Sequence, residues 1–228
     1  MGIVTISRQY GSDGRTVGLR TSKRLGYRYV NKEILSEVAQ KANVPVNEVE
    51  RFDEQPESAA VRVLRKFLAP SYTTVGPELA EHDWWTATTL AGATPSTHES
   101  LSLDEDVFVQ LTRGVINQIA EQGNLILLGR GCQALLAGRA DVLHVRVVAP
   151  FDYRVAVAVR RDGLDPDAAA AEVRQMDQLR QNYLKRHYNV DWNRADQYHL
   201  VVNTAWMGIE GASALIESAA RALPFHEE

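Results

Sequence analysis

The sequence contains one cysteine, Cys132, and no apolar run that approaches the roughly 20 residues of a membrane-spanning helix. A single cysteine excludes an internal disulfide framework and a metal site built from several cysteines. The N-terminus also lacks a basic region followed by a long apolar stretch, which is the pattern of a secretory signal peptide. These absences lead us to expect a cytoplasmic protein without a membrane segment.

Two common kinds of active site are also missing from the pattern. The six histidines are scattered along the chain, and no pair has the short spacing that is typical of metal ligands. Ser12 has no evident partners for a catalytic triad. We therefore expect neither a zinc enzyme nor a serine hydrolase.

Charge is distributed unevenly, although the whole chain carries a formal net charge of only −4. Residues 1–35 hold seven Lys and Arg against two Asp and Glu, whereas residues 36–110 hold five against thirteen. No long basic stripe suited to duplex DNA is present, so no nucleic-acid partner is expected. A basic N-terminal unit fits a compact anion such as a nucleotide phosphate, although most of these charges also fit an ordinary solvated surface.

Apolar patterns predict short strands that alternate with longer helices. The expected strands are 2–6, 124–128, 141–150 and 197–204, and the expected helices are 15–25, 31–42, 57–68, 151–161, 166–188, 208–222 and one that begins after Ser102 and ends at Gly123. Strands separated by helices predict an α/β protein whose parallel sheet is covered on both faces.

Residues 69–103 differ from the rest of the chain, because Pro, Gly, Ser and Thr interrupt any period there. A stretch of this length without regular structure is usually a functional loop or a disordered one. It contains the pair Trp84-Trp85, which either anchors the loop on the core or contacts a ligand or partner.

The stretch QYGSDGRT, residues 9–16, lies between the first predicted strand and the first predicted helix. A phosphate-binding loop needs this order, because exposed backbone N–H groups and a helix N-terminus then face the anion. The pattern G-x-x-x-x-G-K-[ST] places its second glycine on Gly14 and its hydroxyl on Thr16, but Gln9 replaces the first glycine and Arg15 replaces the lysine. Asp13 adds a negative charge that a cation or an arginine has to offset.

Arg130 follows a predicted buried strand and is flanked by Gly129 and Gly131. Ligands of open parallel sheets bind at the carboxyl ends of the strands, so this guanidinium is expected near the glycine loop. Arg130 is interpreted as a ligand contact, with a structural salt bridge as the alternative.

Two predicted helices joined by RDGLDP carry many arginines: Arg154, Arg160, Arg161, Arg174, Arg180 and Arg186. A helical hairpin of this kind suits a lid that brings positive charge onto a transferring phosphoryl group and excludes water. The alternative is a surface helix that carries ordinary ion pairs, such as Arg174 with Asp177.

With these residues assembled, the chain resembles the cytidylate-kinase-like family of P-loop nucleoside monophosphate kinases. The matching stretches are residues 3–15, 26–35, 125–131, 142–164, 176–192 and 198–204. Their order and spacing span most of the chain and are more specific than any single motif, and residues 69–103 lie outside the match.

The resemblance implies a P-loop NTPase fold, which is a three-layer α/β/α sandwich with a parallel sheet. It implies one kinase domain with a core over 1–35, 105–159 and 190–228, a helical monophosphate-binding insertion over 36–104, and a helical lid over 160–189. It also implies ATP with Mg²⁺ as the phosphoryl donor and a nucleoside monophosphate as the small-molecule acceptor. The oligomeric state stays open, with a homodimer as one option.

The resemblance also implies roles for particular residues. The donor phosphates would be held by Gly11, Ser12, Asp13, Gly14, Arg15 and Thr16, and Thr16 would face magnesium. Arg130 would bind the acceptor phosphate, with Asn31 beside it. The charge on the transferring phosphoryl group would be stabilised by Arg154, Arg160, Arg161 and Arg180, and Asp177 would orient a lid arginine.

Some positions depart from the family pattern, which tends to have aspartate at the position of Asn31 and Tyr-Asp at the position of Tyr198-His199. Two hypotheses follow. The first is a nucleoside monophosphate kinase, or a kinase of a related small acceptor. The second, motivated by Gln9, Arg15 and Asn31, is a nucleotide-binding module without catalysis that acts through a partner.

Overall fold

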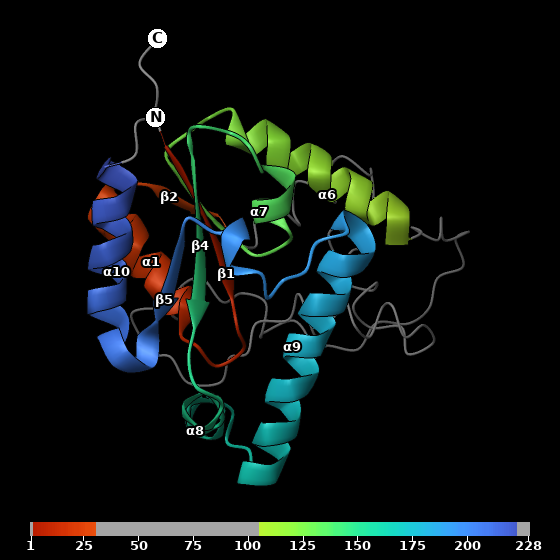
Figure 1. The fold of residues 1–228 in the computed structure, drawn as a ribbon, viewed down its shortest axis with the longest axis vertical. Coiled ribbons are helices and arrows are strands. Elements are labelled where there is room, and N and C mark those ends of the chain that lie inside the picture. Colours follow the sequence, from red (N-terminus) through yellow and green to blue (C-terminus); the bar gives the residue numbers. More distant parts are fainter. Residues whose placement is uncertain (1, 31–104, 223–228) are drawn as a thin grey trace, which may run out of the picture.

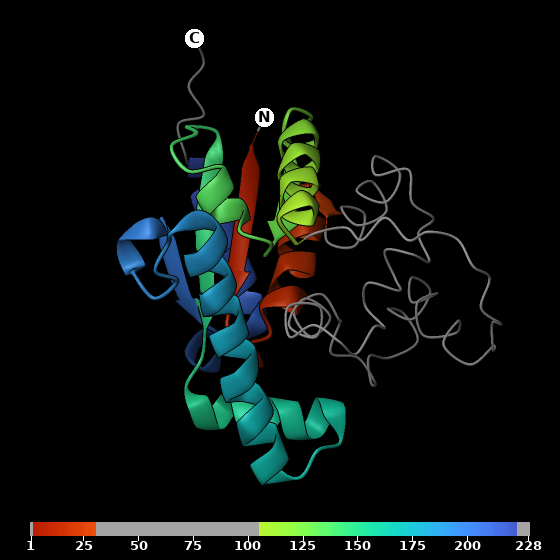
Figure 2. The ribbon, with the colours of Figure 1, turned by 90° about the vertical axis from the view of Figure 1, so that its right-hand side faces the viewer.

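The computed structural model describes residues 2–30 and 105–222. The expected insertion over 36–104, the helices expected at 31–42 and 57–68, Trp84-Trp85 and Asn31 therefore lie outside the described residues. The described residues form a sheet with helices packed on both of its faces (Figures 1 and 2).

The sheet has five strands in the order β2-β3-β1-β4-β5, and all of the neighbouring pairs are parallel. The strands are β1 (Ile3–Arg8), β2 (Arg28–Val30), β3 (Leu125–Leu128), β4 (Val142–Val148) and β5 (Leu200–Asn203). The predicted α/β class and parallel sheet are confirmed. The short strand β2 was not predicted, because three residues that follow a helix-ending glycine carry too little periodic signal.

The helices divide between the two faces of the sheet. They are α1 (Gly14–Leu25), α6 (Glu105–Ala120), α7 (Cys132–Leu135), α8 (Phe151–Asp162), α9 (Pro166–Tyr188) and α10 (Thr204–Ala222), with a 3₁₀ turn η2 (Ala195–Gln197) before β5. Helices α1 and α10 cover one face, at the left of Figure 1, and α6 and α7 cover the other. None of the described helices combines the length and apolar character that crossing a bilayer demands.

Alternation along the strands builds the core on both faces. Ile3 points toward the α6 side, whereas Val4 and Ile6 point toward α1 and α10. In β3, Leu125 likewise lies on the α6 side and Ile126 on the α1 side. A strand that is buried on both faces carries apolar residues continuously, as the near-unbroken runs IVTI and LILL predicted.

Helix ends follow the predicted signals. Gly26 ends α1 with a φ of 70°, a left-handed conformation that glycine adopts without steric cost. The carboxylate of Asp165 caps α9 by accepting hydrogen bonds from the backbone N–H groups of Asp167 and Ala168. The last helix was predicted to begin at Gly208, but the helical segment begins at Thr204 and is interrupted at Gly208, where φ is 65° and ψ is 174°.

Helices α8 and α9 form a hairpin at the carboxyl end of the sheet (Figures 1 and 2). Their contact buries Ala158, Ala169, Val173 and Met176 together with Tyr10 from the glycine loop. The hairpin contains the segment that was expected to serve as a lid, and its loop-facing side is therefore packed directly against residues 9–13.

His144 of β4 is a buried titratable group on the side of the sheet away from α1. Its Nδ1 lies 2.8 Å from the hydroxyl of Thr5, and its ring stacks on His199 with the centroids 5.0 Å apart. Burial, and to a lesser extent the neighbouring His199, lowers the pKa of His144 to about 4. His144 is therefore neutral in the folded protein at physiological pH.

We predict that this histidine makes the fold sensitive to acid. The folded pKa lies below the unfolded value of about 6.5, so the unfolded state takes up the proton first as the pH falls. This contribution, about 3 kcal/mol, is fully present above about pH 6.5 and is lost by about pH 4. Urea unfolding of the wild type and of His144→Gln over this range measures the share of His144; parallel pH profiles for the two proteins would contradict the prediction.

Candidate functional site

Several of the residues that sequence analysis singled out converge at the carboxyl edge of the sheet. Strand β1 leads into the glycine loop, β3 leads into Gly129-Arg130-Gly131, and β4 leads into α8. Strand β1 lies between β3 and β4 in the sheet, so the three connections are neighbours. This edge is where ligands of open parallel sheets bind.

The glycine loop has a defined, tightly packed backbone. Gly11 and Asp13 adopt left-handed conformations, with φ of 75° and 56°. A Cβ on Gly11 would lie 2.6 Å from the carbonyl oxygen of Arg154, so this glycine allows α8 to approach the loop. Ser12 is fully buried, with its hydroxyl 2.9 Å from the carbonyl oxygen of Gln9 and 3.2 Å from that of Val147. The Ser12 hydroxyl therefore shapes the loop from inside.

Helix α1 begins at Gly14, so its first turn presents backbone N–H groups that have no acceptor within the helix. Asp13 precedes this turn and Thr16 lies in it. The carboxylate of Asp13 does not cap the helix and instead accepts a hydrogen bond from the hydroxyl of Tyr153 at 3.0 Å. Burial, reinforced by the Asp13 charge, raises the pKa of Tyr153 and keeps this hydroxyl protonated as a donor. The start of α1 thus carries two side chains with oxygen atoms that can bind a cation, the carboxylate of Asp13 and the hydroxyl of Thr16.

Arg15, which replaces the expected lysine, lies toward β2. Its positive charge is close enough to the Tyr29 hydroxyl to oppose the rise in the pKa of Tyr29, which burial takes to about 12. Its charge also lowers the pKa of Arg8 at the end of β1. Arg15 is therefore one of several guanidinium groups at this edge.

Arg130 is buried, with only 5% of its surface exposed, in a run of three left-handed residues from Gly129 to Gly131. Its Nη1 is buried and has no hydrogen-bond partner within the described part of the chain. Burial lowers the pKa of Arg130, and the positive charge of Arg8 lowers it further. The alternative of a structural salt bridge finds no support among residues 2–30 and 105–222, where Arg130 forms no ion pair.

Arg180 reaches the same edge from α9. It is 8% exposed, and its Nη1 donates a hydrogen bond of 2.9 Å to the carbonyl oxygen of Arg8. Its Nε is buried and has no partner in the described ranges. Burial lowers the pKa of Arg180, with Arg8 as the next largest cause.

Sequence analysis missed Arg8, the last residue of β1. Its neighbours identify it as a member of the site, because its charge acts on Arg130 and Arg180 and its carbonyl oxygen receives the Arg180 bond. Burial also lowers the pKa of Arg8 itself. The available signal was a charged residue at the end of a buried strand, immediately before a glycine loop.

Arg154 and Asp177 form a clamp on the loop and stay engaged with protein groups. Their side chains pair at 2.6 Å between Nη1 and Oδ2, and Oδ1 of Asp177 accepts the backbone N–H of Tyr10 at 2.8 Å. Arg154 also donates to the carbonyl oxygens of Ala149 at 3.0 Å and Tyr10 at 3.2 Å. Asp177 thus pairs with an arginine of α8, while Arg174 lies over the ring of Phe151.

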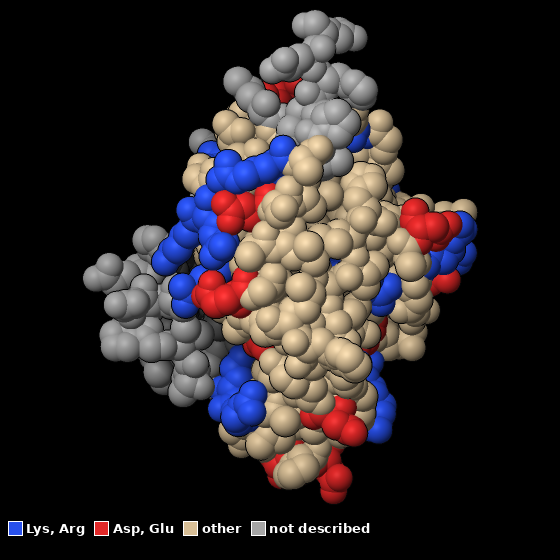
Figure 3. Space-filling model, turned by 60° about the vertical axis from the view of Figure 1, so that its left-hand side comes forward, with Lys and Arg blue, Asp and Glu red and all other residues tan. Residues whose placement is uncertain are grey.

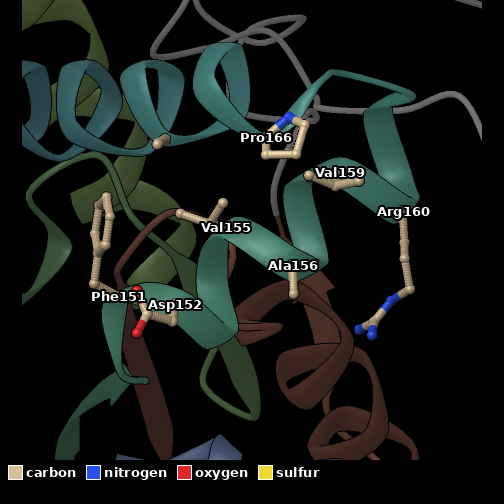
Figure 4. A pocket seen from close by; sticks show the side chains of 8 residues that line it. Phe151, Asp152, Val155, Ala156, Val159, Arg160 and Pro166 are labelled. Carbon is tan, nitrogen blue, oxygen red and sulfur yellow. The ribbon is translucent and has the colours of Figure 1, made fainter.

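The two remaining predicted arginines occupy different surroundings. Arg161 pairs with Asp162 at 2.8 Å and lies over the ring of Tyr10, whose hydroxyl donates to Asp162 at 3.0 Å. Arg160 is exposed and borders a pocket of about 470 Å³ between α8 and the start of α9 (Figure 4). The pocket is lined mainly by apolar side chains such as Val155 and Val159, so Arg160 is not gathered with the buried arginines.

Charge balance separates this edge from the rest of the surface. On the face of α1 and α10, basic and acidic groups lie side by side (Figure 3), as in the ion pairs Arg20–Glu210 at 3.3 Å and Arg24–Glu217 at 2.7 Å. In the described ranges, Arg8, Arg130 and Arg180 form no ion pair, and the charge of Arg8 lowers the pKa of the other two. Since guanidinium groups keep their charge at neutral pH, this concentration of positive charge suits a polyanion.

The chain is similar to one protein family and to parts of several known proteins. A family model described as the cytidylate kinase-like family matches residues 3–205. A cytidylate kinase of Methanocaldococcus jannaschii is 29% identical over 104 residues, which are 45% of this chain and 58% of that protein. A uronate isomerase of Corynebacterium glutamicum is 28% identical over 147 residues, which are 62% of this chain and 28% of that protein. The chain thus spans less than two thirds of the length of either relative.

Among solved structures, an uncharacterized protein from Eubacterium ventriosum superposes with a TM-score of 0.65 at 14% identity, covering 97% of this chain and 99% of that chain. At this identity the likeness concerns the fold alone.

We predict that the Arg154–Asp177 clamp stabilises the fold. Asp177→Asn removes the charge that compensates a buried guanidinium, so the free energy of unfolding should fall by about 3 kcal/mol in urea. Asp196→Asn is the matched control, because Asp196 pairs with Arg194 on the surface, where such pairs contribute little. Equal urea midpoints for the two variants would show that the clamp is energetically unimportant.

Proposed function

The chain belongs to the cytidylate kinase-like family, and on that premise we propose that it transfers the terminal phosphoryl group of ATP to a nucleoside monophosphate or a related small acceptor. The observation that carries the proposal is the cluster of Arg8, Arg130 and Arg180 beside the glycine loop. Arg130 and Arg180 are buried, and each has a guanidinium nitrogen without a hydrogen-bond partner in the described ranges. Family membership supports a nucleotide-kinase-like function. The arginine cluster supports phosphate as the group that is recognised.

In phosphoryl transfer the protein mainly positions two phosphates in line and neutralises their charge. In the proposed arrangement the first-turn N–H groups of α1 hold the donor phosphates, with Arg15 beside them. Arg130 binds the acceptor phosphate through its buried, unpartnered Nη1. Arg180, fixed by its bond to the carbonyl of Arg8, stabilises the charge of the transferring group.

The lid arginines divide between positioning and direct contact in this proposal. Arg154 and Asp177 position the loop by holding both backbone groups of Tyr10. Arg160 is exposed on α8, where it would reach the donor nucleotide, whereas Arg161 pairs with Asp162 and lies over the ring of Tyr10.

The residues at the start of α1 fit Mg²⁺. This ion keeps several waters and takes one or two protein oxygens together with phosphate oxygens. Thr16 would supply a hydroxyl and Asp13 a carboxylate, and both stand in or next to the first turn of α1. The bound ion would offset negative charge on the donor phosphates and on Asp13. Tyr153 orients the Asp13 carboxylate through its hydrogen bond.

A second candidate function is a nucleotide-binding module without turnover that acts through a partner. The observation that favours it is the engagement of Arg154 with Asp177 and of Arg161 with Asp162, which turns two predicted catalytic arginines toward protein groups. Nucleotide binding without turnover separates this function from a kinase.

The test of the proposed function is ADP release from ATP and Mg²⁺ in the presence of CMP, dCMP, UMP, AMP, GMP or dTMP. Acceptor-dependent release identifies a nucleotide kinase and its substrate class. ATP binding without release for any acceptor would contradict the kinase proposal and favour the non-catalytic module.

Replacing Arg130 by Met should lower kcat/KM for the acceptor by about 100-fold, because a charge-assisted contact to phosphate is lost. The loss should fall mainly on KM for the acceptor, with KM for ATP little changed. Arg194→Met serves as a control, because Arg194 is exposed and pairs with Asp196. An Arg130→Met enzyme with wild-type acceptor kinetics would remove Arg130 from the site.

A further inference from the structure

We propose that Arg8 supplies the phosphate-binding cation that a P-loop usually carries as lysine. In this chain the cationic residue stands at the first glycine position of the motif, and a glycine stands at its lysine position. The inference rests on the proposed function, since it names a residue of the same phosphate site. Its basis is the path of the Arg8 side chain past Gly14 and Gly129.

The conformation of the loop places the pattern one residue earlier than the sequence suggested. Asp13 has a φ of 56°, a left-handed conformation that glycine adopts most easily, and α1 begins at the next residue. If Asp13 occupies the second glycine position of G-x-x-x-x-G-K-[ST], the first glycine position falls on Arg8, the lysine position on Gly14 and the Ser/Thr position on Arg15, so that the hydroxyl of Thr16 lies one residue beyond the pattern. The pattern's first glycine has thus become an arginine, and its lysine has become a glycine.

Contacts around Gly14 explain why these two changes belong together. Gly14 has no left-handed φ, so its backbone does not require glycine. A Cβ at this position would lie 2.5 Å from Cβ and 3.0 Å from Cγ of Arg8. Any side chain on residue 14 would therefore collide with the stem of Arg8, and the two positions cannot both carry long side chains.

The far end of Arg8 has a similar relation to Gly129. A Cβ on Gly129 would lie 1.9 Å from Nη1 of Arg8, so the guanidinium lies directly on the backbone after β3. Arg130, the proposed acceptor-phosphate ligand, is the next residue. Arg8 therefore spans the gap from the start of α1 to the Arg130 turn, which is the path between a donor and an acceptor phosphate.

Electrostatics gives Arg8 no partner of opposite charge within the described ranges. Burial is the largest cause of its lowered pKa, and Arg15 lowers it further. Its own charge lowers the pKa of Arg130 and Arg180. Arg8 therefore adds to a repulsion that a bound phosphate would relieve.

The experiment measures binding of inorganic tripolyphosphate and of ATP by calorimetry, together with the thermal midpoint, for wild type, Arg8→Met and the control Arg20→Met. Arg20 is an exposed arginine of α1 that pairs with Glu210. We expect Arg8→Met to weaken both ligands at least about tenfold and Arg20→Met to leave them unchanged. Without ligand, the midpoint of Arg8→Met should equal or exceed that of wild type, because a repelling charge is gone.

A second pair of variants tests the exchange itself. Arg8→Gly should lose tripolyphosphate binding, and adding Gly14→Lys to it should restore binding toward the wild-type value. In the wild-type background, Gly14→Lys should impair binding, because it meets the Arg8 stem. If Arg8→Met does not fold, this pair of variants tests whether Arg8 binds the phosphate.

The outcomes separate the inference from the proposed function. A wild-type protein that binds neither tripolyphosphate nor ATP would contradict the proposed function. A wild type that binds both, with Arg8→Met binding equally well, would overturn the role of Arg8 and leave the proposed function standing. A folded Arg8→Gly/Gly14→Lys protein that binds no better than Arg8→Gly would overturn the exchange of places.

Discussion

Repulsion among guanidinium groups is the constraint around which this edge of the protein is organised. Arg8, Arg130 and Arg180 converge from a strand end, a glycine turn and a long helix, and within the described ranges no carboxylate pairs with any of them. Burial lowers the pKa of all three, and the charge of Arg8 lowers the pKa of Arg130 and Arg180 further. A protein keeps such a cluster only when the rest of the fold holds it in place, and its chemistry suits an anion that carries several charges.

The surrounding structure supplies that support through contacts on the glycine loop. Asp177 and Arg154 hold the two backbone groups of Tyr10, while Arg161 and Asp162 hold its ring and hydroxyl. The hydroxyl of Thr204 donates to the carbonyl of Ser12 at 3.0 Å and joins β5 and α10 to the same loop. The loop is therefore fixed from both sides of the sheet, so its amides and the nearby arginines keep their positions without a ligand.

Much of this fold was predictable from local sequence signals. The strands around Val4, Ile126 and Val145 and the cap at Asp165 follow from periodicity and capping chemistry, which are local properties. The convergence of Arg130 with the glycine loop also followed, because parallel strands end at one edge. The pairing of Asp177 with Arg154 was not predictable, since it depends on how α9 packs on α8. The role of Arg8 was hidden because the motif was aligned one residue late, and only the left-handed backbone of Asp13 reveals the shift.

The central claim is that the arginine-lined edge binds a polyphosphate. Thermal unfolding of the wild-type protein with ATP, inorganic tripolyphosphate or adenosine at low and high salt tests it most directly. The account predicts that ATP and tripolyphosphate raise the midpoint, that adenosine has a much smaller effect, and that salt reduces the phosphate-dependent shift. A midpoint that adenosine raises as much as ATP, or that no phosphate compound changes, would contradict it.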